Sequence, residues 1–77
     1  MSKELIETIA RALVDEPDHV EVNAVEREDA VVFELTVAPD DIGKVIGRQG
    51  RTIKALRTLL HAASIKSQRR AELEVME

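Results

Sequence analysis

Two glycines separated by two residues, Gly47 and Gly50, interrupt a stretch of the chain that otherwise has the apolar spacing of helices. Glycine has no Cβ and tolerates backbone conformations that other residues avoid, so the pair predicts a sharp turn. The spacing on either side predicts a short helix that ends at Gly47 and a longer helix over 51–66. The apolar positions are Ile42, Val45 and Ile46 before the turn, and Ile53, Leu56, Leu60 and Ala63 after it. The fold must therefore place two consecutive helices at an angle around a tight loop.

The rest of the chain has the patterns of one further helix and of strands. Residues 2–15 have an apolar stripe at helical spacing, whereas alternation predicts strands over 19–26, 30–37 and 70–76. The resulting order, α-β-β-α-α-β, predicts an α+β fold in which helices pack on one face of a three-stranded sheet. We expect residues 1–77 to form one domain, because a chain of this length supports one core.

The segment before the short helix has the composition of a helix start. Asp40 follows Pro39 and is predicted to cap the helix, because a short acidic side chain accepts hydrogen bonds from free backbone N–H groups there. Asp41 would then lie in the first turn, near the positive end of the helix dipole.

Composition excludes several classes of protein. The longest unbroken apolar run has four residues, Ala30 to Phe33, which is too short for a membrane span or a signal-peptide core. The chain has no Cys, which excludes disulfides and thiolate zinc sites, and Phe33 is its only Phe, Tyr or Trp. We therefore expect a cytoplasmic protein with no metal, cofactor, membrane or small-molecule substrate. Because so small a core is marginally stable, a partner subunit is also expected.

The charged residues are segregated along the chain. The formal net charge is −4, which taken alone argues against a nucleic-acid partner. The interval from Gly43 to Arg70, however, contains no Asp or Glu. Its eight basic residues are Lys44, Arg48, Arg51, Lys54, Arg57, Lys66, Arg69 and Arg70. This acid-free segment holds the predicted turn and both helices around it, so its local charge favours a phosphate-bearing partner.

The residues of the turn suit contact with phosphates. Gly47 and Gly50 allow a ligand to approach the backbone closely, because no Cβ stands in the way. The N–H groups at the start of the following helix lack partners within the helix and can donate to phosphate oxygens. Arg48 supplies a positive charge, and Gln49 supplies a neutral donor and acceptor.

The sequence Ile46-Gly47-Arg48-Gln49-Gly50-Arg51-Thr52-Ile53 resembles the V-I-G-x-x-G-x-x-I signature of the KH domain. The α-β-β-α-α-β order resembles the type II arrangement of that family, and the likeness extends over the whole chain. More closely, the chain resembles the small, stand-alone KH proteins of bacteria.

The resemblance implies a binding site for single-stranded RNA. KH domains hold about four nucleotides, with the G-x-x-G loop against the sugar-phosphate backbone. The loop before the last strand, here Ser67-Gln68-Arg69-Arg70, would form the rim of the groove. The implied RNA-binding residues are Lys44, Ile46, Gly47, Arg48, Gln49, Gly50, Arg51, Ile53, Lys54, Arg69 and Arg70.

The resemblance also implies a biological role. The small bacterial KH proteins are described as probable RNA chaperones and post-transcriptional regulators that influence growth of the cell envelope and cell shape. They pair with a second KH-containing protein, so a homodimer or such a heterodimer is expected here. A single groove grips RNA weakly, and pairing would raise the effective affinity.

Three other interpretations remain open at this stage. The glycines could form only a turn between helices, with charges that only solubilise the protein. The KH fold could serve as a protein-interaction module that does not bind RNA. Two helices with a glycine turn also resemble, superficially, a helix-turn-helix reader of duplex DNA. The strand predicted after the second helix fits the KH arrangement better.

No pattern in the chain indicates an enzyme. His19 and His61 lie far apart in the sequence without neighbouring metal ligands, and we interpret both as surface or groove-edge residues. Thr52 follows Arg51, so the loop is not the G-K-[ST] loop of nucleotide-binding proteins. The carboxylates are scattered, and no nucleophile–base pair is discernible.

Overall fold

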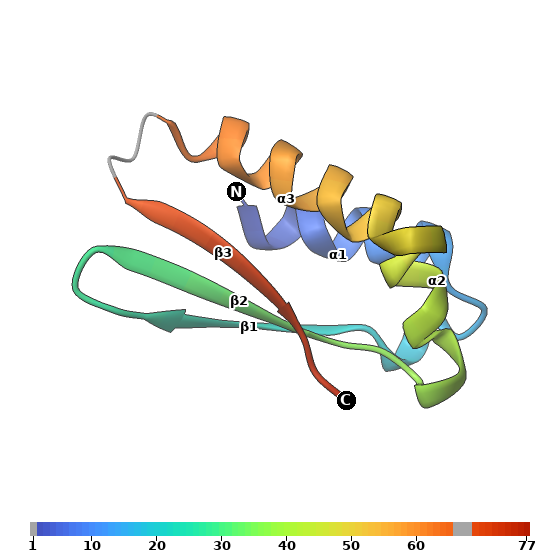
Figure 1. Cartoon of the computed structure of the whole chain (residues 1–77). Coiled ribbons are helices and arrows are strands. Elements are labelled where there is room, and N and C mark those ends of the chain that lie inside the picture. The colour runs from blue at the N-terminus through green and yellow to red at the C-terminus, as the bar shows by residue number, and fades with distance from the viewer. Residues whose placement is uncertain (1, 66–68) are drawn as a thin grey trace.

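The computed structural model describes residues 2–65 and 69–77 and shows helices packed on a mixed sheet (Figure 1). Its elements are α1 (Ser2–Leu13), β1 (Glu21–Glu26), β2 (Ala30–Thr36), α2 (Ile42–Ile46), α3 (Arg51–Ala63) and β3 (Arg70–Val75). Short 3-10 turns cover Pro17–His19, Pro39–Asp41 and Arg48–Gly50. The predicted order α-β-β-α-α-β is confirmed.

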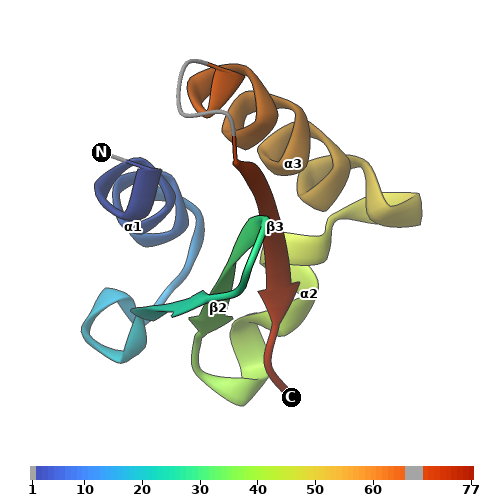
Figure 2. The ribbon, with the colours of Figure 1, turned by 90° about the vertical axis from the view of Figure 1, so that its left-hand side faces the viewer.

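The sheet has the order β1-β2-β3, with β2 in the centre. β1 pairs antiparallel with β2, whereas β3 pairs parallel with β2, and Ala24, Phe33 and Leu73 lie in register across the sheet. The parallel pairing requires a crossover, which α2 and α3 provide. Figures 1 and 2 show α1 and α3 over the same face of the sheet and α2 near one end of it. The predicted α+β architecture, with helices on one face, is therefore confirmed.

The core lies between this face of the sheet and the helices. Phe33 and Leu35 of β2 face Leu56 and Leu60 of α3, and all four side chains are buried. Val45 of α2 is fully buried in the same cluster. Full burial of one such side chain contributes about 1.5–3 kcal/mol. The core thereby anchors both helices that flank the Gly47–Gly50 loop.

Several predicted elements are shorter in the structure. The helix predicted over 2–15 ends at Leu13, and the strands predicted to residues 37 and 76 end at Thr36 and Val75. The strand predicted from residue 19 begins at Glu21, because Pro17–His19 forms a 3-10 turn. There the N–H groups of His19 and Val20 donate to the carbonyls of Glu16 and Pro17. The helix predicted to residue 66 ends at Ala63, and residue 66 itself lies outside the described part of the chain.

The prediction that Asp40 caps α2 was wrong. Asp41 occupies the position before α2, and its side chain makes no capping bond to that helix. Instead its carboxylate accepts hydrogen bonds from the backbone N–H groups of Asp15 (3.2 Å) and Glu16 (3.1 Å), beyond the end of α1. Asp41 is only 1% exposed. It therefore connects the end of α1 to the start of α2, a contact between distant residues that local helix-start chemistry does not predict.

Candidate nucleic-acid interface

The Gly47–Gly50 loop joins α2 to α3 through unusual backbone angles. Gly47 has φ 78° and ψ 167°, Gln49 has φ 57° and ψ 24°, and Gly50 has φ 75° and ψ 16°. Residues other than glycine rarely adopt positive φ, so the glycines permit this turn. The Gly47 N–H donates to the Gly43 carbonyl (2.9 Å), and the Gly50 N–H donates to the Gly47 carbonyl (3.0 Å). These bonds define the conformation of the loop.

Gly47 also packs directly against the first turn of α3. A Cβ placed on Gly47 would overlap the hydroxyl of Thr52 and lie 2.7 Å from the Thr52 backbone nitrogen. The nearest atom to a Cβ on Gly50 would be Ile53 Cγ2, at 3.9 Å. Gly47 is therefore required both for its backbone angles and for close packing, whereas Gly50 is required for its angles alone.

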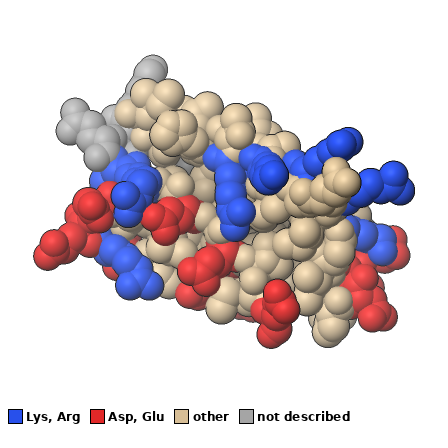
Figure 3. All heavy atoms as spheres, in the orientation of Figure 1, with Lys and Arg blue, Asp and Glu red and all other residues tan. Residues whose placement is uncertain are grey.

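The start of α3 is open to a ligand. Its N-cap residue is Gly50, and no side chain caps the first turn, where the helix dipole places partial positive charge. Arg48, Arg51 and Lys54 are exposed around this turn, and none has an ion-pair partner among the described residues. Arg51 donates one weak hydrogen bond to Gln49 Oε1 (3.4 Å). Figure 3 shows Lys and Arg side chains along α3 and its junction with α2.

The two apolar residues of the predicted site have different surroundings. Ile46 is partly buried at the end of α2, next to the loop. Ile53 is 5% exposed and belongs to the core cluster. Ile53 therefore supports the loop from beneath, whereas Ile46 retains some surface beside it.

Lys44, on α2, is held by carboxylates. Its Nζ lies 3.3 Å from an Asp15 oxygen and 3.5 Å from an Asp41 oxygen. The contact with Asp15, followed by that with Asp41, raises the pKa of Lys44 above its ordinary value. Burial opposes ionisation of Asp41, but the two backbone hydrogen bonds and Lys44 outweigh burial and lower the pKa of Asp41. Lys44 thus takes part in the contact between α1 and α2.

Arg69 is engaged in contacts within the protein. Its guanidinium lies 2.7 Å from Glu26 Oε1 and donates to the carbonyls of Arg27 (2.8 Å) and Ala30 (3.0 Å). These contacts hold the start of β3 against the β1–β2 turn. Arg70 Nε donates to Glu72 Oε2 (2.9 Å). Of the predicted rim, residues 67 and 68 lie outside the described part of the chain.

A surface hollow lies between α3 and β3, and the predicted site omitted the α3 residues that line it. This α3–β3 hollow has a volume of about 460 Å³ and is lined by Arg57, His61, Ala71, Glu72, Leu73 and Glu74. Arg57 donates from Nε (3.3 Å) and Nη2 (3.1 Å) to the Leu73 carbonyl, which connects the two walls. The spacing of Lys54, Arg57 and His61, three and four residues apart, could have placed them on one face of the helix.

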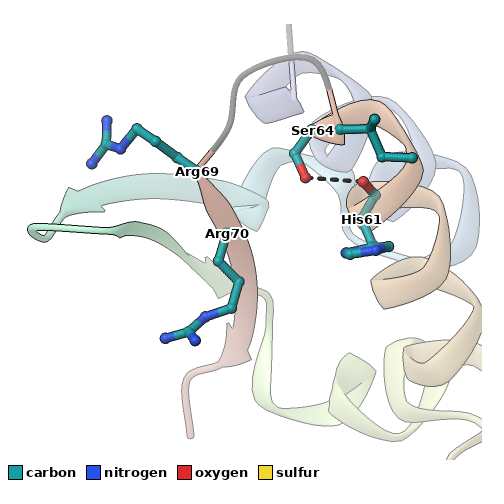
Figure 4. Close-up of a pocket in the computed structure, with 5 residues that line it drawn as sticks. His61, Ser64, Arg69 and Arg70 are labelled. Atoms are coloured by element: carbon teal, nitrogen blue, oxygen red, sulfur yellow. Dashed lines mark hydrogen bonds between the residues drawn. The ribbon is translucent and has the colours of Figure 1, made fainter.

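A second hollow adjoins the first, because His61 lines both. It has a volume of about 290 Å³ and is lined by His61, Ser64, Ile65, Arg69 and Arg70. Figure 4 shows the His61 ring extending from α3 toward the gap, whereas the side chains of Arg69 and Arg70 extend away from α3. The two predicted rim arginines therefore do not point toward the helix wall.

Among the described residues, a membrane-spanning helix and a metal-binding cluster are both absent. Within this part of the chain, no helix is long and apolar enough to cross a membrane. The same residues contain no cluster of three His, Cys, Asp or Glu side chains that could hold a metal ion.

A G-x-x-G loop between two helices, on an α-β-β-α-α-β chain with a mixed three-stranded sheet, defines a KH domain of the type II arrangement. The model of the KhpA/KhpB KH-domain family matches residues 3–75 of the chain. The chain therefore belongs to this family, and the predicted resemblance is confirmed.

Relatives from several bacteria are similar over almost the whole chain. The RNA-binding protein KhpA of Caldanaerobacter subterraneus is 52% identical, covering 95% of this chain and 97% of the relative. The protein of the same name from Clostridium acetobutylicum is 51% identical, covering 96% and 99%. That of Chlamydia trachomatis is 45% identical, covering 97% and 96%. The family is one of RNA-binding proteins, which agrees with the prediction that the chain is not an enzyme.

Proposed function

We propose that this protein binds single-stranded RNA through the Gly47–Gly50 loop and the first turns of α3. The observation that carries the proposal is the loop itself. It has positive φ at Gly47, Gln49 and Gly50, leads into a helix start without a side-chain cap, and lies in a segment without acidic residues. Backbone N–H groups and cations placed together in this way suit the phosphates of a nucleic-acid strand.

The predicted site residues take different roles in this proposal. Gly47 and Gly50 shape the turn, Arg48 and Gln49 at its tip contact phosphates, and Arg51 and Lys54 extend the positive surface along α3. Ile46 and Ile53 border and support the loop. Lys44, Arg69 and Arg70 lie at the periphery of the site and contribute less, because their charged groups already contact Asp15, Glu26 and Glu72 respectively.

We expect modest affinity with a definite salt dependence. Three or four phosphate contacts predict a slope of log K against log salt of about −2 to −3, because each contact on a single strand contributes about −0.7. A single KH groove of this size holds few nucleotides. The proposal therefore includes pairing, either as a homodimer or with a second KH-containing chain similar to KhpB. Exposed Leu59 and Ile65 near the end of α3 support association with another chain.

The proposed biological role is that of an RNA chaperone and post-transcriptional regulator in the cytoplasm, with an effect on cell shape. All 77 residues would act as one KH domain. The names of the relatives, which are RNA-binding proteins in bacteria, support the RNA-binding part of this role. Sequencing the RNA that co-purifies with the tagged protein, and identifying the proteins retained with it, tests the remainder.

The decisive experiment replaces the loop tip in the double variant Arg48→Asp, Gln49→Asp. We expect RNA binding, measured by fluorescence anisotropy, to be lost, because two carboxylates would face the phosphates. The thermal melt should hardly change, since both side chains are exposed. The matched control is Lys3→Asp, Thr8→Asp on α1, which changes the net charge equally at exposed positions. Figure 2 shows α1 on the side opposite the α2–α3 junction.

Each outcome discriminates between functions. Loss of binding in the loop variant but not in the α1 variant supports the proposal. Equal weakening in both variants would indicate only a general effect of charge. A wild-type protein that prefers duplex DNA at matched salt would favour the helix-turn-helix reading. A wild-type protein that binds no RNA but forms a specific complex with another protein would favour the interpretation as a protein-interaction module.

A further inference from the structure

The α3–β3 hollow has two walls of different charge. The α3 wall carries Arg57 and His61, whereas the β3 wall carries Glu72 and Glu74 beside Ala71 and Leu73. Phosphates are repelled by the carboxylates of the β3 wall, and the exposed cations of the Gly47–Gly50 loop and α3 attract them. A bound strand would therefore keep its backbone on the loop and α3, and would direct its uncharged bases toward β3.

His61 carries the only aromatic ring that borders this hollow. The sequence has one Phe, no Tyr, no Trp and two His. Phe33 is buried in the core, and His19 lines a different hollow, together with residues such as Thr36 and Pro39. His61 is exposed, lines both hollows at the α3–β3 gap, and extends its ring into that gap (Figure 4).

The surroundings of His61 are ordered. Arg57 precedes it by one helical turn, and its two hydrogen bonds to the Leu73 carbonyl hold the guanidinium against the β3 wall of the same hollow. After it, the Ser64 hydroxyl and N–H both donate to the His61 carbonyl, at 3.0 and 3.1 Å, and close the last turn of α3. These bonds engage only the backbone of His61, and among the described residues no hydrogen bond or ion pair engages its ring. The ring is thus available to a ligand that enters the α3–β3 hollow.

We infer that His61 is a stacking platform for one base of the bound RNA, in the α3–β3 hollow and one step away from the nucleotides held by the loop. The volume of about 460 Å³ lies within the roughly 300–1,000 Å³ of pockets that hold small organic groups. Every base offers a π-face, so this contact adds affinity without strong sequence preference. The inference rests on the proposed function, because it adds a base-binding position to the same RNA site.

The experiment compares four replacements of His61 on a short single-stranded RNA that carries 2-aminopurine at one position at a time. His61→Ala should weaken binding about fivefold, the lower end of the range for base–aromatic stacking. His61→Phe should retain the affinity, because a phenyl ring also stacks. His61→Leu should resemble His61→Ala, since bulk alone does not replace an aromatic face. His61→Lys should bind RNA as weakly as His61→Ala. His19→Ala, on another surface, is the control and should bind like the wild type.

The fluorescence of 2-aminopurine supplies a readout that affinity alone does not. Stacking on the ring should quench the probe at one position of the strand in the wild type and His61→Phe, and the quenching should disappear in His61→Ala. Rescue by Lys, or equal affinity of all variants, would overturn the inference. Wild-type binding that is lost in the Arg48→Asp, Gln49→Asp variant but unchanged in His61→Ala would overturn this inference alone. RNA binding absent from the wild type would overturn the proposed function.

Discussion

The Gly47–Gly50 loop and the start of β3 both contribute basic residues to the acid-free segment, but they use them differently. At the loop, Arg48 has no ion-pair partner among the described residues and is exposed to solvent. At the start of β3, Arg69 contacts Glu26 and two backbone carbonyls, and Arg70 contacts Glu72. Among the described residues, charge without an ion-pair partner thus gathers at the loop and the first turns of α3, whereas Lys44 and the arginines at the start of β3 contact carboxylates within the protein.

This difference shows what separates a binding arginine from a structural one. An arginine that already donates to carbonyls and a carboxylate must give up those bonds before it contacts a phosphate, and hydrogen bonds to charged groups contribute about 1.5–3 kcal/mol. Arg48 has no such cost. The local charge of a segment therefore overstates the charge available to a ligand, and only the contacts of each side chain distinguish the two.

The largest expected effect comes from disrupting the loop. Gly47→Ala would force a Cβ into Thr52 and place alanine at φ 78°. We expect destabilisation of more than about 2 kcal/mol, because backbone strain and overlap add, together with loss of RNA binding as Arg48 is displaced. Urea denaturation and RNA anisotropy measure the two effects.

Gly43→Ala is the matched control for this change. A Cβ on Gly43, within α2, would meet no atom within 4 Å, so this variant should be as stable as the wild type or more stable by up to about 1 kcal/mol. Its RNA affinity should be unchanged. Equal stability and affinity of Gly47→Ala and the wild type would show that the close packing on Thr52 is not required.

The variants Arg69→Ala and Arg48→Ala test the difference between the start of β3 and the Gly47–Gly50 loop directly. Arg69→Ala removes the contacts with Glu26, Arg27 and Ala30, and should destabilise the protein by about 1–3 kcal/mol while leaving the salt dependence of RNA binding unchanged. Arg48→Ala should leave the melt unchanged and make the slope of log K against log salt shallower by about 0.7.

Binding is measured on folded protein, below the onset of each variant's thermal transition. Arg70→Ala is the control for the start of β3, because its contact with Glu72 is exposed and contributes about 0–1 kcal/mol. A change of the salt slope in Arg69→Ala as large as that in Arg48→Ala would remove the distinction between the two regions.

Local patterns were sufficient to predict the elements and the loop. Apolar periodicity located every helix and strand to within a few residues, and the glycine pair located the turn, because both signals act over a few neighbouring positions. Contacts between distant residues could not be predicted in this way. Asp41 bonds to Asp15, and Arg69 bonds to the β1–β2 turn, across 26 and more than 40 residues of sequence.

The surroundings of the candidate RNA-binding site were also predicted only where they depend on neighbouring residues. The exposure of Arg48 and Gln49 at the tip of the loop could be predicted, because the glycine turn exposes them whatever packs around it. The sequence did not predict that Arg57 lines the α3–β3 hollow, since this position depends on the Leu73 carbonyl at the facing edge of β3. Only the parallel pairing of β3 with β2 brings that edge beside α3.

The smallest expected effect concerns Asp41, which lies directly before α2 and contacts the chain beyond the end of α1. Asp41→Asn keeps one of the two oxygens that accept from the N–H groups of Asp15 and Glu16, replaces the other by an NH2 donor, and removes the charge that faces Lys44. We expect the melting temperature at pH 7 to fall by a few degrees. RNA affinity should fall little, because Arg48 and the start of α3 keep their positions.

The pH dependence of the melting temperature tests whether the charge of Asp41 accounts for the lower stability of Asp41→Asn. The pKa of Asp41 is lowered in the folded protein, so its carboxylate stabilises the fold above the unfolded-state pKa of about 3.9, and this contribution is lost as the pH falls through the lower folded-state value. The difference in melting temperature between the wild type and Asp41→Asn should therefore be constant near neutral pH and shrink below about pH 4. A difference that persisted unchanged in acid would mean that shape at this buried position, rather than the charge of Asp41, holds α1 to α2.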